Sequence, residues 1–595
     1  MSMSKNWLPF LVVALAFLVR VWALELKPPH FDEGVNGAFV DNLRRVPSYE
    51  YRPDNFHGPL HFYAMFTSTQ FFGRGVWALR FPTVVIGAAT VALVFAFRRF
   101  FSVRTVFVAA VAMAISPGMI FYSRYAIHET WLPFFTLLAM YGAFGIAGGE
   151  RRLRDLWCVG VGISGMVLTK ETYVLHFAAA FLAWRACRSM FSSSPREVRT
   201  RPSVVFGVEE SAPEEVQPAF ARADIQLVVG VCIAVVVTLY SGLFGYWRGV
   251  GGIFETFIHM ARKGWTVSEE GHHKELLYYV KLFGIYEWPA FAGLMMAPVF
   301  ALRRSGWAGG IALVCGVALF AASWLWTAGQ PVSSHAFQSI EPFLETRGIR
   351  WDTPMSLGFC LAAVGACLLV AIPLKCPRLR FLALYGLASV AAYSFVSYKT
   401  PWCVINLIWP FWFLLGHLFD RMTQHSDGRL VVALGCILAM IPLLDAHRIN
   451  IEDPAANREP YIYVQQTRDL ELLTKPVEKL IERDPQRRNS MTGYIIYDSP
   501  QPLPWALPEL KNVVLLSHVG PISFGDADFL LVHESRVEEV ESQLLDIYFR
   551  SRFRFFGEDE NHRLYLRATT FHDLVEPGRV AEFHRRIPLE PEGER

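Results

Sequence analysis

The feature that most constrains this chain is a series of long apolar blocks that continues to about residue 446. Each block has roughly 17 to 22 residues, close to the 20 or so that a helix needs to cross a bilayer. Only 18% of the residues are charged, whereas soluble domains carry about 25%. The pattern predicts a polytopic α-helical membrane protein with about thirteen transmembrane helices. The expected spans lie near residues 7–24, 76–97, 104–122, 131–148, 156–169, 172–189, 225–246, 289–303, 307–326, 355–374, 381–396, 402–418 and 429–446.

The fifth and sixth of these spans form one apolar stretch, which suits either a single very long helix or a tight hairpin. Basic segments flank both ends, GERRLRD before the stretch and RACR after it. Basic loops tend to stay in the cytoplasm, and only a hairpin returns both flanks to the same side. We therefore expect a break within Thr169–Thr172.

The remaining loops set the expected orientation of the chain in the membrane. The basic loops RRFFSVR, GERRLRD, ALRRSG, LKCPRLR and FDRMTQHSDGR all fall on one side of the predicted topology. That side is cytoplasmic by the positive-inside rule. The chain is thus predicted to be a multi-pass protein of the cytoplasmic (inner) membrane, with a cytoplasmic N-terminus and with everything after residue 446 outside.

Composition divides the chain into three regions. Residues 1–446 form the transmembrane domain, with a first outer loop at 25–75 and a polar, Pro-containing cytoplasmic loop at 191–223 that is predicted to be disordered. Residues 447–575 combine an amphipathic helix pattern with short apolar runs between turns, which favours an extracytoplasmic α/β domain. Residues 576–595 are charged and are predicted to be a flexible tail.

Polar and ionisable residues gather in the loops that this topology places outside. The spans themselves contain few such residues, which disfavours a polar transport path through the membrane. The net charge of +3 is too small to indicate nucleic acid binding. In the first outer loop, Asp32 is expected to cap a surface helix, with Glu33 at its positive end. A second surface helix is expected to begin at Pro59.

Several motifs resemble those of a known superfamily. They are FDEG from residue 31, DNFHGPL from residue 54, LRFPTVVIG, ISPGMIFYSRYAIHET and LTKET, spread over roughly residues 10–180. Together they resemble the dolichyl-phosphate-mannose protein mannosyltransferases and the lipid A aminoarabinose transferase, which have the GT-C fold. HGPLHFY and SYKTPW are similar to a flippase-activity-associated branch known from archaeal N-glycosylation. Gly58 departs from the mannosyltransferase pattern, which has a proline there.

The resemblance implies an inverting glycosyltransferase of the hexosyl- or mannosyltransferase type. Such an enzyme moves a sugar from a polyprenyl-phosphate-linked donor to a protein, glycan or lipid acceptor at the outer face, among membrane lipids. A carboxylate must then accept the proton of the acceptor hydroxyl, and Asp32 is the candidate, with Glu33 beside it. The phosphate leaving group needs cations, and the candidates lie at outer ends of spans: Arg124, Lys170 and Lys399.

Four further residues are candidates for holding the acceptor or a metal ion. His57 and His61 are spaced to share a helix face. Glu129, about one turn beyond Arg124, and Asp54, in the first outer loop, are the acidic candidates. Histidine and carboxylate suit several divalent ions. A divalent metal cofactor is compatible with these residues, but nothing in the sequence requires one, and a structural or acceptor-lining role for the two histidines is favoured over metal binding.

Two other functions remain open from the sequence. One is a non-catalytic or transport role that assists translocation of a lipid-linked sugar. The other is a receptor-like binding module with its recognition pocket in residues 447–595. The glycosyltransferase interpretation makes a spatial prediction, namely that five side chains surround one outer cavity: Asp32, Glu129, Arg124, Lys170 and Lys399.

Overall fold

The structure is a computed structural model of the 595-residue chain. The residues that it describes are 7–52, 57–149, 152–191, 220–265, 274, 276–287, 289, 374, 376–396, 398–425, 427–455, 459–517, 524, 527–556, 562–575 and 582–585. Three predicted spans, at 289–303, 307–326 and 355–374, lie almost entirely outside these residues. The same holds for most of the predicted linker at 191–223.

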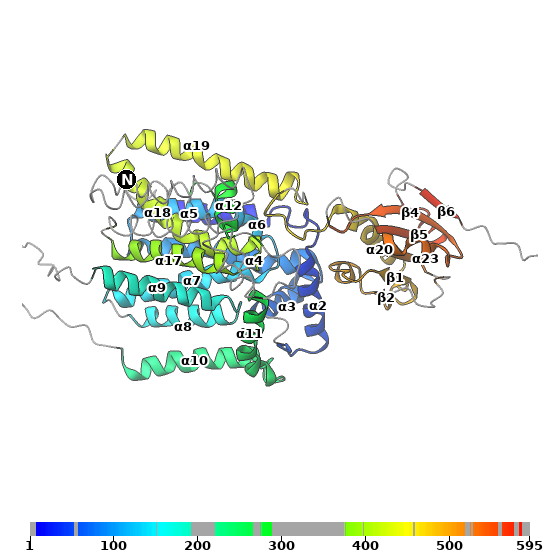
Figure 1. The fold of residues 1–595 in the computed structure, drawn as a ribbon, viewed down its shortest axis with the longest axis horizontal. Helices are drawn as coiled ribbons and strands as arrows, with labels where there is room; N and C mark the ends of the chain where they lie inside the picture. The colour runs from blue at the N-terminus through cyan, green and yellow to red at the C-terminus, as the bar shows by residue number, and fades with distance from the viewer. Residues whose placement is uncertain are drawn as a thin grey trace, which may run out of the picture.

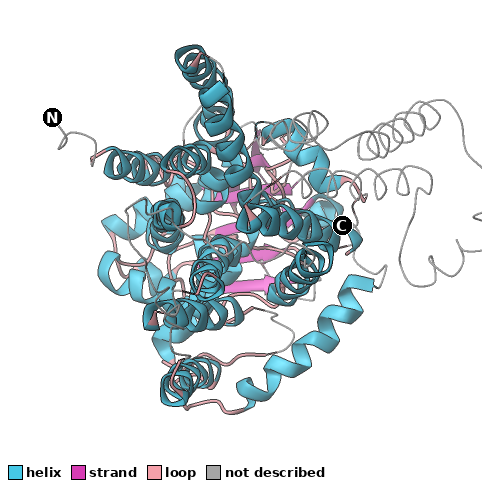
Figure 2. Cartoon of the chain, turned by 90° about the vertical axis from the view of Figure 1, so that its left-hand side faces the viewer, coloured by secondary structure: helices cyan, strands magenta, loops and turns pink. Residues whose placement is uncertain are grey.

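Long helices run side by side and form a bundle (Figure 1). Figure 2 looks along this bundle and shows most of them end-on, with the strands of a sheet behind. The bundle helices are α1 (Leu8–Val21), α4 (Val76–Ala96), α5 (Val103–Ile115), α6 (Pro117–Ser123), α7 (Trp131–Ala147), α8 (Leu153–Val167), α9 (Tyr173–Phe191), α10 (Arg222–Tyr240), α17 (Pro377–Phe395), α18 (Val404–His425) and α19 (Gly428–His447).

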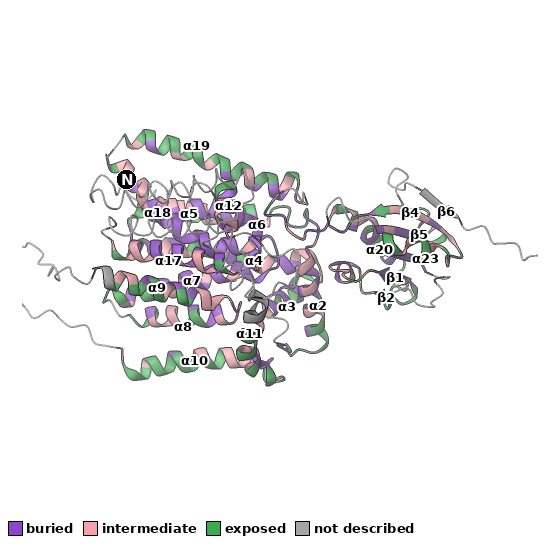
Figure 3. Cartoon of the chain, in the orientation of Figure 1, coloured by how far each residue is buried: buried purple, intermediate pink, exposed green. Residues whose placement is uncertain are grey.

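Burial separates the inner helices from the outer ones (Figure 3). In α18, 72% of the apolar stretch is buried, and its Trp409 and Phe413 sit in the bundle core. In α10 and α19 only 11% and 17% of the apolar stretch is buried. Large apolar surfaces on these outer helices are what lipid chains cover in a membrane. The protein is thus a multi-pass membrane protein.

Among the described residues, five helices are long and apolar enough to cross a membrane. The bent pair α5–α6, with an angle of 54° between its halves, raises this number to six if the pair is one span. The predicted total of thirteen is therefore not confirmed. The predicted break in the fifth apolar stretch is confirmed, because α8 ends at Val167 and α9 begins at Tyr173.

One end of the bundle carries short helices that lie across it, and we call it the loop end. They include α2 (Phe31–Arg45), α3 (Leu60–Phe72), α11 (Arg248–Trp265) and α12 (Tyr278–Tyr286). Figure 1 shows α2 crossing this end at a steep angle to the bundle helices. Two sequence predictions need correction here. The N-cap of α2 is His30 rather than Asp32, and Pro59 precedes α3 as its N-cap.

Beyond the loop end lies a six-stranded sheet with the order β2-β1-β3-β5-β4-β6. β1 pairs in parallel with β2 and β3, while β5 pairs antiparallel with β3 and β4, and β6 with β4. Helices such as α20 (Glu471–Arg483) and α23 (Val537–Glu541) accompany it, so this part has the α/β character that the sequence predicts. The strands are β1 (Thr492–Ile496), β2 (Asn512–Leu516), β3 (Phe529–His533), β4 (Ile547–Phe553), β5 (His562–Arg567) and β6 (Glu582–Arg585), the last within the predicted tail.

The sheet part packs directly on α2. The short helix α22 (Leu503–Ala506) lies against it, and a Cβ added at Gly34 or Gly37 would overlap Pro502 or Trp505 respectively. Arg74 reinforces this contact by donating to the carbonyl of Trp505 at 2.6 Å. The absence of side chains at the two glycines therefore permits the close approach of the sheet part to the helix that begins beside Asp32.

A short segment, Tyr461–Gln466, connects the bundle to the sheet part and crosses the loop end; we call it the strap. Gln465 forms an isolated β-bridge with His30. Val464 has a φ of 51°, which is rare for a β-branched residue and indicates strain held by the surrounding contacts. The strap brings chain from the C-terminal part next to the start of α2.

Candidate functional site

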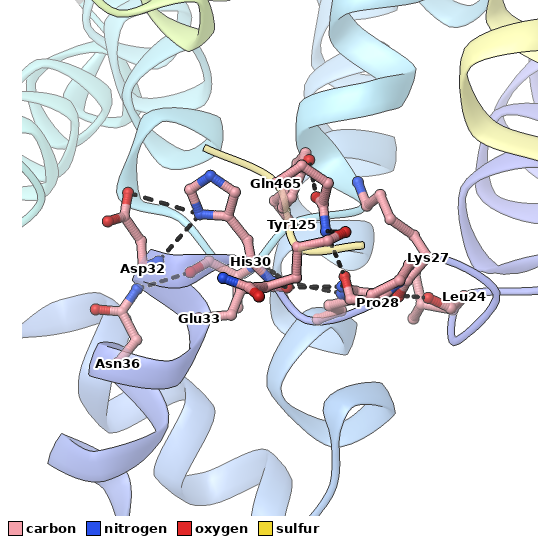
Figure 4. Close-up of polar contacts among 12 residues, drawn as sticks. Leu24, Lys27, Pro28, His30, Asp32, Glu33, Asn36, Tyr125 and Gln465 are labelled. Atoms are coloured by element: carbon pink, nitrogen blue, oxygen red, sulfur yellow. Dashed lines mark hydrogen bonds and ion pairs between the residues drawn. The ribbon is translucent and has the colours of Figure 1, made fainter. Parts of the chain in front are cut away.

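Asp32 lies in the first turn of α2, where the helix dipole stabilises negative charge. Its side chain is 41% exposed, and within the described part of the chain its carboxylate accepts no hydrogen bond. The nearest polar partner is His30, whose Nδ1 lies 3.9 Å from Asp32 Oδ2 (Figure 4). Asp32 therefore has an accessible carboxylate with unused acceptor capacity.

His30 has a fixed hydrogen-bond pattern. Its Nδ1 accepts from the main-chain N–H of Asp32 at 3.0 Å, and its Nε2 donates to the carbonyl of Tyr463 at 2.8 Å. Because a neutral imidazole has one donor and one acceptor nitrogen, these bonds assign the proton to Nε2. The ring thereby ties the start of α2 to the strap and holds Asp32 in place.

Glu33 is buried, unlike Asp32, and all its oxygen atoms are engaged. Oε1 accepts from Arg80 Nε at 2.7 Å and from the N–H of Ala126 at 2.8 Å. Oε2 accepts from Arg80 Nη2 at 2.6 Å and from the N–H of His30 at 2.8 Å. Although burial opposes ionisation, Arg80 and these hydrogen bonds lower the pKa of Glu33 to about 2. These four bonds leave the Glu33 carboxylate without a free acceptor position, and the catalytic role predicted for it stays a prediction.

Arg80 is the most completely bonded cation at the loop end. Besides its two bonds to Glu33, it donates to the carbonyls of Leu24, Lys27 and Pro28 at 2.6 to 3.1 Å. All five N–H groups of the guanidinium are thus used. Arg80 fastens the chain between α1 and α2 to α4, which makes it structurally important although the sequence did not single it out.

Arg124, the predicted phosphate-binding residue at the end of the third span, uses its guanidinium within the protein. Its guanidinium points back to the end of α1, where Nη1 donates to the carbonyls of Arg20 and Trp22 at 3.0 and 2.5 Å. Nη2 donates to the carbonyl of Ala23 at 2.9 Å. The carbonyls at a helix C-terminus lack partners within the helix. Arg124 satisfies them and is therefore a helix-capping residue.

Arg20, which lies in α1, makes the reciprocal contact with α5. Its Nη1 and Nη2 donate to the carbonyls of Ala114 and Met113, at 3.2 and 3.3 Å. These carbonyls lie where α5 bends into α6 and where the helical hydrogen-bond ladder is interrupted. Two buried arginines thus complete the interrupted backbone of α1 and α5.

Lys170 and Glu129 come together at the loop end, as predicted. The ammonium group forms an ion pair with the Glu129 carboxylate, and the lysine side chain is 14% exposed. Trp402, in the turn Pro401–Cys403, has its ring 5.8 Å from that of His30. This contact joins the Pro401–Cys403 turn to the start of α2.

The predicted pair of histidines converges on a third histidine. The rings of His57 and His61 lie 4.6 and 4.5 Å from that of His128. His57 also lies 3.4 Å from Glu171, a buried carboxyl whose pKa burial raises to about 8. His57 precedes α3, so the two predicted histidines do not share a helix face; both contact the η3 turn (His128–Thr130) instead.

No group of three or more His, Cys, Asp or Glu side chains among the described residues is placed to hold a metal ion. The metal candidates His57, His61 and Glu129 therefore form no such site there. Asp54, the fourth candidate, lies outside the described residues. Metal binding has no geometric support in this part of the chain.

Burial of His61 gives a prediction for acid stability. Desolvation lowers its pKa to about 4. As the pH falls from 6.5 to 4, the unfolded chain binds a proton at this residue that the folded chain does not bind. The free energy of unfolding should thus fall by at most about 3 kcal/mol over this window. Thermal unfolding of His61→Gln in detergent should show a weaker dependence on pH than the wild type, and equal slopes would contradict the prediction.

Lys399 lies just before η4 (Pro401–Cys403), and its Nζ donates to the carbonyl of Lys274 at 3.0 Å. Of the five residues predicted to surround one cavity, Arg124 faces α1, and Lys170 and Glu129 pair with each other. A cluster of mainly aromatic side chains lies near the start of α2 and packs around a gap too small for a water molecule; its members are His30, Tyr122, Tyr125, Ile127, Trp402, Tyr461 and Tyr463.

The arrangement has known counterparts among solved structures. ArnT from Cupriavidus metallidurans bound to undecaprenyl phosphate matches with a TM-score of 0.53 and 12% identity, covering 96% of this chain and 100% of that chain. The apo oligosaccharyltransferase of Archaeoglobus fulgidus matches with a TM-score of 0.43 and 13% identity, covering 94% of this chain and 75% of that chain. The match to ArnT gives the chain the GT-C fold that the resemblance implied.

The sequence comparison covers a smaller part of the chain than the structural comparison does. A sequence model of the family dolichyl-phosphate-mannose-protein mannosyltransferase matches residues 56–196, which contain His57, Glu129 and Lys170. No sequence among curated proteins is significantly similar to the chain. The superfamily is thus supported by fold and by motif, while the archaeal N-glycosylation branch stays a prediction.

Proposed function

We propose that this protein is an inverting glycosyltransferase that moves a sugar from a polyprenyl-phosphate-linked donor to an acceptor hydroxyl. The observation that carries the proposal is Asp32, an exposed carboxylate without a hydrogen-bond donor among the described residues, held by His30 in a GT-C fold. A general base needs this unused acceptor capacity at the point where the acceptor arrives. Glu33, by contrast, has no capacity left.

In the proposed reaction, Asp32 takes the proton of the acceptor hydroxyl as the oxygen bonds to the anomeric carbon. The bond from that carbon to the phosphate oxygen breaks at the same time, and the polyprenyl phosphate leaves as an anion. Attack from the face opposite the phosphate inverts the anomeric configuration. Cations must stabilise the departing phosphate, and Lys170 and Lys399 remain the candidates after Arg124 is assigned to α1.

We place the reaction at the loop end. The helices α2 and α3 lie at this end of the bundle, and the sheet part lies beyond it (Figure 1). With the positive-inside orientation, the loop end and the α/β domain at 447–575 face outward from the cytoplasmic membrane. Residues 1–446 then form the catalytic transmembrane domain, and residues 576–595 form a tail. The acceptor is a protein, glycan or lipid of the cell envelope.

The test is sugar transfer by the purified full-length protein in proteoliposomes. Polyprenyl-phosphate mannose and polyprenyl-phosphate glucose, labelled in the sugar, serve as donors with cell-envelope extract as acceptor. Label should move to the acceptor fraction with release of polyprenyl phosphate, and NMR of the product should show an inverted anomeric centre. If the label instead crosses the bilayer while still attached to the lipid, translocation is the function and the proposal is wrong.

A further inference from the structure

A buried imidazole bridges two helices of the bundle. His176 lies in the first turn of α9. Its Nδ1 lies 2.6 Å from the hydroxyl of Tyr385, and its Nε2 lies 3.0 Å from the hydroxyl of Tyr393. Both tyrosines belong to α17 and are likewise buried. The three side chains therefore form one hydrogen-bonded unit between α9 and α17, which we call the histidine clamp.

Both ring nitrogens of His176 are used in the clamp. A neutral imidazole has one donor and one acceptor nitrogen, so the ring accepts from one tyrosine hydroxyl and donates to the other. Inside a membrane bundle such polar groups cost free energy unless they are bonded. Apolar side chains of the same shape would join the two helices with little or no loss of stability. The clamp therefore points to a role beyond holding the helices together.

The two helices that the clamp joins carry the two lysines assigned above to the departing phosphate. Lys170 stands six residues before His176, in the turn that leads into α9. The main-chain N–H of Tyr173, the first residue of α9, donates to the carbonyl of Lys170 at 3.1 Å. Lys399 stands six residues after Tyr393, just beyond the end of α17. A shift of α9 against α17 would therefore move one cation relative to the other.

A third helix connects the clamp to the segment that carries Lys399. The ring of Tyr279, on α12, lies 6.2 Å from that of Tyr393 in an edge-to-face arrangement. The Tyr279 hydroxyl donates to the carbonyl of Thr400 at 3.3 Å, next to Lys399. Tyr393 thus packs against the side chain that holds the backbone beside this lysine, whereas the other clamp tyrosine lies about two turns further back along α17.

We propose that the histidine clamp is a positioning device, which holds Lys170 and Lys399 at the spacing needed to contact one lipid-linked phosphate. The proposal rests on the proposed function for its ligand, and it deepens that function by naming positioning residues that do not touch the substrate. The attraction between a cation and a phosphate weakens with distance. A displacement of about 1 Å can lower a rate about a hundredfold, so a loosened clamp should weaken the phosphate contact.

Binding of a polyprenyl phosphate by the full-length protein tests the proposal without turnover. The probe is undecaprenyl phosphate, and undecaprenol, which has the same chain without the phosphate, measures the contribution of the lipid alone. Native mass spectrometry in detergent gives both affinities and hence the preference for the phosphate. The wild type should prefer the phosphate. Tyr393→Phe, which removes one hydroxyl and keeps the ring, should lower this preference by roughly tenfold, the scale of one weakened bond to a charged group. His176→Phe should lower it at least as much.

Tyr385→Phe is the matched control. It removes the other hydroxyl that bonds to His176, but at the end of the clamp further from Lys399. Its thermal stability should fall about as much as that of Tyr393→Phe, while its preference for the phosphate should stay that of the wild type. His176→Gln, whose amide offers one donor group and one acceptor, should recover part of the preference that His176→Phe loses.

Thermal unfolding of each variant identifies any that fails to fold, and if His176→Phe fails, Tyr393→Phe decides. The proposal is wrong if folded Tyr393→Phe keeps the wild-type preference. It is also wrong if Tyr385→Phe loses as much preference as Tyr393→Phe, because the clamp would then only stabilise the helix pair. A wild type that does not prefer the phosphate would overturn both this proposal and the lysine roles. A wild type that prefers the phosphate but transfers no sugar would remove the proposed function alone.

Discussion

Asp32→Asn is expected to slow sugar transfer by about a hundredfold to ten-thousandfold, the usual contribution of a general base. The amide keeps the size of the side chain but cannot accept the proton of the acceptor hydroxyl. The bond from the main-chain N–H of residue 32 to His30 does not involve the side chain, so the fold should be unaffected. Initial rates in proteoliposomes, with donor and acceptor saturating, measure the loss.

The matched control for this variant is Glu50→Gln. Glu50 is also an acid of the loop end, but it is exposed and pairs only with Arg52 among the described residues. Transfer by Glu50→Gln should equal that of the wild type. Normal transfer by Asp32→Asn would remove Asp32 from the mechanism, whereas equal losses in both variants would point to a general effect of surface charge.

Arg80→Met is expected to lower the free energy of unfolding by about 3 to 5 kcal/mol, as when one member of a buried ion pair is removed. The variant would leave Glu33 as a buried charge without its counterion and three carbonyls without a donor. Arg80→Lys should recover little of the lost free energy of unfolding, because an ammonium cannot reproduce the five-donor geometry of a guanidinium. Thermal and denaturant unfolding in detergent measure the change.

A double-mutant cycle tests whether Arg80 and Glu33 stabilise the fold as a pair. Glu33→Gln removes the charge but keeps the shape, and combining it with Arg80→Met removes the uncompensated ion. The double variant should thus be less destabilised than the sum of the two single variants. Strict additivity would mean that the two side chains do not act as a pair. Arg104→Met is the control, because Arg104 is 62% exposed and pairs with Asp420 at 3.6 Å.

The position of the candidate residues at one end of the bundle was predictable, because membrane topology places the loops that carry them on the same side. Asp32 and the Lys170–Glu129 pair follow from that sorting, since each lies at the end of an apolar block. The role of Arg124 was not predictable in this way. An arginine at the end of a span can bind phosphate or cap a helix, and its partner α1 lies about a hundred residues away in sequence.

Other residues were missed although their motifs were noticed. Arg80 stands in LRFPTVVIG, near the start of an apolar span. Placing a charge there costs free energy, so a charged residue in such a position usually has a structural or functional role. His128 stands beside Glu129 in SRYAIHET, and Glu171 follows Lys170 in LTKET. The strap, YIYVQQ, was hidden for a different reason. It has no periodic pattern, and only the tertiary fold reveals that its tyrosines pack against Tyr122 and Trp402.

The reciprocal capping of α1 and α5 has a consequence for biosynthesis. Arg124 follows Arg20 by 104 residues, and at about 5 to 20 residues per second a ribosome needs on the order of 5 to 20 seconds to make that stretch. Until then the last carbonyls of α1 have no protein partner, a costly state in hydrocarbon. The first helix therefore enters the bilayer before the residue that caps its C-terminus has been synthesised. The final position of α1 in the bundle depends on the insertion of α5 and α6, so these three helices fold as one unit.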